Sequence, residues 1–330
     1  MISHARRLKN LNVQNSKEKN DATQFRNTVQ LGLQKLNDRA TVKQGVSELL
    51  SIVDSLKQSN LPIFLNCLFS VSGQDQPMAR REIVRIIGCV ASVHGVLCTP
   101  FLPRIIAYLL SRLKDNDSGI RDACSETFGF LGAFTMSYSP ESLNIWFKSA
   151  QQSPSDPNFA LSFPLSGLFR PLLTSLEENR FIPLLQGATQ CIQTIIERVP
   201  PEIISLAWPY IGQRIIALFS SQQCPMASQL LNVIGTLFKV IPETIEPQSS
   251  VLALIAAEHL QHNDWIVRRS AIEAIRCAII AGIKIYGIVI GMQRMNINMN
   301  RNSNSGSIEN EQIKGLESVF VIQQLNYIPQ

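Results

Sequence analysis

Apolar residues recur every three or four positions through most of this chain. In residues 101–114 they fall at i, i+3, i+4 and i+7, and residues 121–134 repeat the pattern. This spacing places apolar side chains on one stripe of a 3.6-residue helix. Strand-like alternation is absent before residue 282, so the sequence predicts an all-α protein. Because the first position of a helix does not need its N–H, several prolines are predicted at helix starts or in turns: Pro62, Pro77, Pro100, Pro200, Pro225 and Pro242.

The helical pattern is itself repeated at a regular interval along the chain. Each copy has an apolar helix, a short polar loop and a second apolar helix, with an arginine near the start of the second helix. The same interval separates Arg80 from Arg121 and Ala227 from Arg268. Gln186 precedes Ala227 by that interval once more, whereas the step from Arg121 to Gln186 is longer by more than half. The sequence therefore predicts one insertion, near residues 136–163.

The interval corresponds to two helices in about 40 residues, which is the repeat length of HEAT and armadillo proteins. One such pair cannot bury its apolar face alone, so successive pairs stack into a continuous core. We expect an α-solenoid of about six HEAT/armadillo-type units over residues 24–282, beginning near residues 24, 61, 100, 160, 201 and 248. Glycines eight positions after the arginine position are expected to let the second helices pack closely: Gly88, Gly129 and Gly235. Residues 1–23 are predicted to be a basic disordered arm, and residues 283–330 an irregular tail that is disordered or truncated.

Charge and cysteine content narrow the class of protein. The chain carries a formal net charge of +5, of which +4 falls within residues 1–26. This arm could contact an acidic partner or could only aid solubility. The nearly neutral array argues against nucleic-acid binding. Seven cysteines without a CxxC pair, and no apolar signal segment, indicate reduced thiols in the cytoplasm. The late apolar run, residues 278–292, is too short for a membrane span.

A search for catalytic and metal-binding motifs gives no candidate. The sequence holds no phosphate-binding loop, no HExxH and no GxSxG motif. His259 and His262 share a helix face, but no third ligand has suitable spacing. We therefore expect a binding scaffold rather than an enzyme, with no cofactor, no metal and no small-molecule substrate.

The polar loops inside the repeats carry two kinds of candidate residue. Asp115, Asp117 and Asp264 are predicted helix N-caps, and Arg121 and Arg268 are predicted to be able to bridge to an aspartate of their own or a neighbouring loop. Together these residues would form a structural ladder. Trp265 is different, since an indole in a polar loop is typical of an interface anchor. Packing of Trp265 onto the preceding loop is the alternative.

Four blocks of sequence resemble the N-terminal domain of the plant Tortifolia/Spiral family of microtubule-associated proteins. They are LNDRAT, LPIFLNC, DNDSGIRDAC and HNDWIVRR, at residues 36–41, 61–67, 115–124 and 262–269. They occur in the family's order, and the resemblance covers about residues 25–280. It implies a TOG-like HEAT array that binds tubulin or microtubules through its inter-helix loops. It also implies a role in cortical microtubule organisation in the cytoplasm.

The resemblance and the repeated arginine position together give a set of candidate tubulin contacts: Arg39, Lys43, Arg80, Trp265, Arg268 and Arg269. The chain departs from a continuous basic edge at Gln186 and Ala227. A related plant group with a similar array binds actin and uses a C-terminal membrane anchor, which is not evident here. A general adaptor that grips a protein partner or actin along the concave face is the alternative function.

Overall fold

The computed structural model describes residues 20–71, 76–135, 165–178, 181–219 and 225–281. The first helix covers residues 20–35. The others are α2 (Val42–Asp54), α3 (Leu61–Phe69), α4 (Pro77–His94), α5 (Leu102–Arg112), α6 (Ser118–Thr135), α9 (Ser166–Glu178), α10 (Ile182–Arg198), α11 (Pro201–Phe219), α12 (Ala227–Val240), α13 (Pro242–Glu258) and α14 (Trp265–Ile280). Two 3₁₀ helices, η1 (Gly95–Phe101) and η2 (His259–Gln261), precede α5 and α14. These residues contain no strand.

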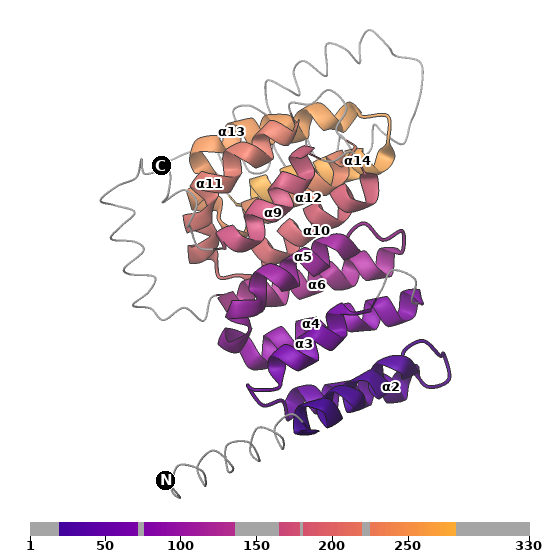
Figure 1. Ribbon diagram of the computed structural model, residues 1–330. Coiled ribbons are helices and arrows are strands. Elements are labelled where there is room, and N and C mark those ends of the chain that lie inside the picture. Colours follow the sequence, from indigo (N-terminus) through magenta and orange to yellow (C-terminus); the bar gives the residue numbers. More distant parts are fainter. Residues whose placement is uncertain (1–19, 72–75, 136–164, 179–180, 220–224, 282–330) are drawn as a thin grey trace, which may run out of the picture.

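The described helices form six antiparallel pairs that stack in chain order (Figure 1). Each pair is one unit, with a first and a second helix, and the second helices pack on one another through the stack: α4 on α6, α6 on α10, and α12 on α14. The core is one apolar cluster that runs through all six units. The prediction of an all-α solenoid of about six HEAT/armadillo-type repeats is confirmed.

Some predicted boundaries were wrong. Helix already covers residues 20–23, which we had placed in the arm, and the fourth unit begins at Ser166 rather than near residue 160. The sixth unit begins at Pro242 rather than near residue 248, because α13 runs through Pro247. Pro171 and Pro209 also lie inside helices. An interior proline removes one backbone hydrogen bond, and burial of the helix against its neighbours offsets this cost. The arm up to residue 19, the insertion near 136–163 and the tail from 283 lie outside the described residues.

Glycines control how closely the second helices approach. A Cβ added at Gly88 would lie 2.9 Å from Thr127 Oγ1, and one added at Gly129 would lie 2.6 Å from Arg198 Cδ. Both distances are shorter than normal contacts, so a larger residue would displace these side chains or widen the spacing between the helices. At Gly235 the added Cβ would lie 3.4 Å from the nearest atom, which is an ordinary van der Waals distance.

Contacts between second helices also correct the register of the fourth unit. Thr127 Oγ1 donates a hydrogen bond to the carbonyl of Val84 at 3.0 Å, and one unit later Thr194 Oγ1 lies 2.6 Å from Ser125 Oγ. Val84 and Ser125 each follow the arginine of their unit by four residues, and Thr127 follows its own by six. Counting six residues back from Thr194 places Ala188 in the arginine position. The sequence comparison of the repeats placed this position two residues too early.

The stretch Pro77–Arg112 is long and apolar enough to cross a membrane, by length and composition alone. It comprises α4, η1 and α5, and the backbone turns at Gly95, where φ is 44°. α4 and α5 belong to successive units, and both bury apolar residues in the common core. The apolar character of this stretch is therefore explained by the stack.

Candidate partner-binding edge

The fully described loops that join the two helices of a unit, those of the first, third and sixth units, lie along one side of the stack, on the right in Figure 1. We call these loops, with the first turn of each second helix, the loop edge. Every second helix begins at this edge. The first amide groups of a helix carry partial positive charge, so the backbone makes the loop edge favourable for acidic groups of a partner.

The aspartates of the loop edge are turned toward backbone amides. Asp117 Oδ1 accepts a hydrogen bond from the Ile120 N–H at 3.2 Å and so caps α6. Asp264 Oδ1 accepts from the Ile266 N–H at 2.9 Å and caps α14. Asp38 Oδ1 accepts from an amide of its own loop at 3.0 Å. These hydrogen bonds fix the orientation of the carboxylates and hold the loops against the starts of the second helices.

Two arginines at the repeated arginine position, Arg121 and Arg268, hold their own loops closed by hydrogen bonds to loop carbonyls. Arg121 Nη1 donates to the backbone carbonyls six and five residues before it, at 2.8 and 3.1 Å. Arg268 Nη1 repeats the arrangement at 2.8 and 3.0 Å. We had expected Arg121 to bridge to an aspartate carboxylate, but its acceptors are carbonyls of its own loop. Arg268, which we had placed among the contact residues, has the same loop-closing geometry.

Arg80 joins its unit to the loop of the next unit through an ion pair with Asp115. Its Nε and Nη2 donate to Asp115 Oδ2 and Oδ1 at 2.7 and 3.2 Å. The two side chains are only 11% and 13% exposed, so Arg80 offers little surface to a partner. Asp115 is not an N-cap, since it lies in the loop and accepts the Asp117 N–H at 3.1 Å. Burial by itself raises the pKa of Asp115, but the hydrogen bonds from Arg80 and from that amide lower it below its ordinary value.

Exposed residues at the two ends of the loop edge are suited to contact a partner. Trp265 and Ile266, the first residues of α14, are 59% and 48% exposed. Arg39, Lys43 and Arg269 are exposed and form no ion pair within the described part of the chain. A cation and a large apolar group therefore stand together at the start of α14.

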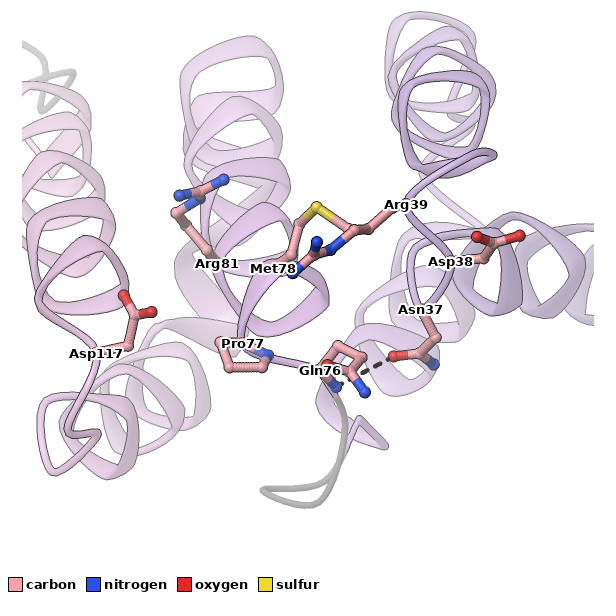
Figure 2. Close-up of a pocket in the computed structure, with 8 residues that line it drawn as sticks. All are labelled: Asn37, Asp38, Arg39, Gln76, Pro77, Met78, Arg81 and Asp117. Atoms are coloured by element: carbon pink, nitrogen blue, oxygen red, sulfur yellow. Dashed lines mark hydrogen bonds between the residues drawn. The ribbon is translucent and has the colours of Figure 1, made fainter.

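A groove of about 760 Å³ opens on the loop edge between the first and third units (Figure 2). Arg39 extends from the first unit toward Met78 at the start of α4, and Arg81 lines the other side of Met78. The groove is fixed by the Gln76 N–H, which donates to Asn37 Oδ1 at 3.3 Å. We had expected Arg80 at this place, but the outward residue is Arg81. The sequence signal was the Arg–Arg pair, which recurs at residues 268–269.

The face formed by the second helices carries polar pairs that join successive units. Gln190 donates to Asp122 at 3.0 Å, Lys239 lies 3.3 Å from Glu273, and Arg198 Nη2 lies 3.8 Å from a carboxylate oxygen of α6. These side chains already have partners within the protein. A ligand on this face would compete with these contacts.

The titratable and thiol groups do not form a reactive cluster in the described residues. No group of three or more His, Cys, Asp or Glu among them could hold a metal ion. The rings of His259 and His262 stack at 6.2 Å, and His259 Nδ1 lies 2.8 Å from the carbonyl of Ile255. Burial raises the pKa of Cys98 to about 11 and that of Cys124 further, so these thiols stay protonated and unreactive.

Stacked helix pairs with an exposed loop edge define a helical-repeat scaffold of the HEAT/armadillo type. Within that class, the family model of the TORTIFOLIA1 N-terminal domain matches residues 23–287, and the chain belongs to this family. It is 30% identical over 247 residues to the microtubule-associated protein TORTIFOLIA1 of Arabidopsis thaliana, covering 74% of this chain and 26% of that protein. It is also 30% identical to the Arabidopsis TORTIFOLIA1-like protein 1, over 74% of this chain and 28% of that protein. The chain thus spans about a quarter of the length of these relatives.

Solved structures similar to this chain are helical-repeat proteins. A mutant of Kap121p matches 88% of this chain and 28% of its own, at 12% identity and a TM-score of 0.49. A designed armadillo repeat protein matches 76% of this chain and 99% of its own, at 13% identity and a TM-score of 0.37.

Proposed function

We propose that this chain is a non-enzymatic scaffold that binds tubulin in cytoplasmic microtubules through its loop edge and contributes to cortical microtubule organisation. Its relative TORTIFOLIA1 is named a microtubule-associated protein. The observation that carries the proposal is the exposure of Trp265 beside Arg269, at the start of a helix whose preceding loop is closed by Arg268.

The physical argument combines three properties of the loop edge. Trp and Arg are the residue types that most often anchor protein interfaces. The loop is held in place by its own cap and by Arg268, so little conformational entropy is lost when a partner binds. Finally, Arg39, Lys43 and Arg269 are exposed and form no ion pair within the described residues, so their charge is available to attract an acidic surface.

Microtubule co-sedimentation at low ionic strength tests the proposal. The chain carrying Trp265→Ala and Arg269→Ala should bind at least about tenfold more weakly than the unchanged chain, the loss expected when two anchors are truncated. Arg268 is left intact, because its removal would also open the loop. A matched control changes Lys57 and Val96, both exposed at the other side of the stack, to alanine and should bind normally.

Two results would count against the proposal. Failure of the unchanged chain to sediment with microtubules at low salt overturns the function. Equal loss in the control overturns the assignment to the loop edge. In the alternative, an adaptor for another protein or for actin on the second-helix face, replacement of Asp122 and Gln190 would reduce binding and replacement of Trp265 would not.

A further inference from the structure

Large apolar residues are exposed at the loop edge in alternate units. Trp265 and Ile266 begin the second helix of the sixth unit. In the fourth unit Ile182 begins the second helix and Phe181 is its N-cap residue, and they are 49% and 45% exposed. In the second unit Met78 is partly exposed at the second position of α4 and lines the groove of Figure 2. Exposed apolar residues in a soluble stack cost solvation free energy, and their gathering on one edge is typical of an interaction surface.

The described first turns of the second helices between them offer no comparable group. The second helix of the third unit begins with Ser118 and Gly119. That of the fifth begins with Ala227, which is buried, and Ser228. The apolar positions are therefore separated by units whose first turns are small and polar.

Phe181 and Ile182 lie further from the arginine position of their unit than Met78 or Trp265 and Ile266 do from theirs. They precede Ala188, which takes the arginine position of its unit, by seven and six residues, whereas Trp265 and Ile266 precede Arg268 by three and two. The helix itself begins at Ile182 in the fourth unit and at Trp265 in the sixth, so α10 has three additional helical residues before this position, which correspond to about 4.5 Å at 1.5 Å per residue. The fourth unit therefore projects its apolar pair about one helical turn beyond the line of the others.

The spacing of these positions indicates the kind of partner. Packed helices lie roughly 8–10 Å apart, so anchors two units apart are separated by roughly 20 Å, and the three span roughly 40 Å. Anchors that are spread over roughly 40 Å can be contacted together by the broad surface of a folded protein, whose interfaces bury about 800 Å² on each side. Arg269, four residues after Trp265, is exposed and forms no ion pair within the described residues, so it adds positive charge that is complementary to an acidic surface. Arg81 beside Met78 already pairs with Glu82 at 3.3 Å.

We propose that Phe181 and Ile182 form the central anchor of one continuous interface, with Met78 and Trp265–Ile266 as its outer anchors, and that its occupant is the folded, acidic surface of tubulin. This inference rests on the proposed function and adds a site to it. The fourth unit makes an apolar contact with the partner, while Arg39 and Arg269 supply the charge contacts around it.

Co-sedimentation of the full chain with microtubules over a range of salt concentrations tests this assignment. The variant Phe181→Ser with Ile182→Ser should bind at least about tenfold more weakly, with the same dependence of affinity on salt, because no charge is changed. Arg269→Ser should instead reduce the salt dependence. The matched control is Val93→Ser with Val96→Ser, which removes apolar groups of 53% and 61% exposure at the opposite side of the stack and should bind normally. Thermal melts monitored by circular dichroism check folding, and Phe181→Ser alone serves as the milder variant.

The outcomes separate this inference from the function on which it rests. If the Trp265→Ala, Arg269→Ala chain loses binding and the Phe181, Ile182 variants do not, the central anchor is wrong and the proposed function stands. Loss in the Val93, Val96 control equal to that in the Phe181, Ile182 variant also overturns the anchor. If the unchanged chain does not bind, both proposals fail.

Discussion

Arg80 of α4 and Asp115 of the next unit form a two-point ion pair, with Nε–Oδ2 and Nη2–Oδ1 distances of 2.7 and 3.2 Å. Both side chains are largely buried. The pair joins a second helix to the loop of the following unit, and Asp115 also accepts the Asp117 N–H. One carboxylate therefore fixes both the shape of its loop and its position against the previous unit.

Removal of one partner from this pair should destabilise the array. Arg80→Ala leaves Asp115 partly buried without its counter-ion, and we expect a loss of about 2 kcal/mol in the free energy of unfolding. Urea titration monitored by circular dichroism measures this loss. Arg85→Ala removes a half-exposed arginine and leaves Glu82 its second partner, Arg81, so it should cost less than about 0.5 kcal/mol. Equal effects of the two variants would contradict the role given to Arg80.

Two glycine-to-alanine substitutions should have opposite signs. At Gly129 the new Cβ would lie 2.6 Å from Arg198 Cδ and 2.8 Å from Thr194 Cγ2, so these side chains must move or α6 and α10 must separate, at a cost of about 1–3 kcal/mol. At Gly167, on α9, nothing lies within 4 Å. There alanine should stabilise by about 0.5 kcal/mol, because glycine has more freedom to lose on folding. The urea midpoints of the two variants measure these changes in stability. A loss of stability in Gly167→Ala as large as that in Gly129→Ala would refute the close-approach argument.

Arg268 should hold the loop before α14 in one conformation. Arg268→Ala removes two hydrogen bonds to loop carbonyls, and we expect the amides of Asp264 and Ile266 to exchange about tenfold faster with solvent. Hydrogen-exchange mass spectrometry or NMR measures these rates. Arg269→Ala, one residue later, removes no such bond and is the control. Unchanged exchange in the Arg268 variant would show that the loop is held by other contacts.

The ion pairs around Glu273 should make stability fall at acidic pH. The hydrogen bond from Arg276, with a smaller contribution from Lys239, lowers the pKa of Glu273 from 4.5 to about 2 in the folded state. A lowered carboxyl pKa stabilises the fold above the unfolded value near 4.5, and this stabilisation is lost as the pH falls toward 2. Half-exposed partners keep the effect small.

The measurement compares urea midpoints of the unchanged chain and of Glu273→Gln. Their difference should be present at pH 6 and should shrink as the pH is lowered below 4.5. The double variant Glu273→Gln, Arg276→Ala should show no further pH-dependent loss from this site. A difference that grows on acidification would have the wrong sign for a lowered pKa.

The helical periodicity of the sequence was sufficient to predict the class of fold, because it reports which face of each helix is apolar. The regular repeat interval likewise located the arginine position in the second, third and sixth units. It failed in the fourth unit, where α10 begins a turn earlier, and it misplaced the start of α13, where a proline lies inside the helix. Spacing in the sequence counts residues along the chain, so it does not reveal where a helix of the repeat begins earlier than in the other units.

What the sequence determined by itself is therefore the local and repeated part of the structure: an all-α array, paired helices, N-capping aspartates at Asp117 and Asp264, and an unusual Trp265. The tertiary structure alone decided which of two adjacent arginines faces outward. Arg80 turns to Asp115 and Arg81 to the groove because packing against the next unit sets the rotation of α4. The exposure of Phe181 and Ile182 was decided in the same way, since an apolar pair at a helix start looks identical in sequence whether a neighbouring unit covers it or leaves it in solvent.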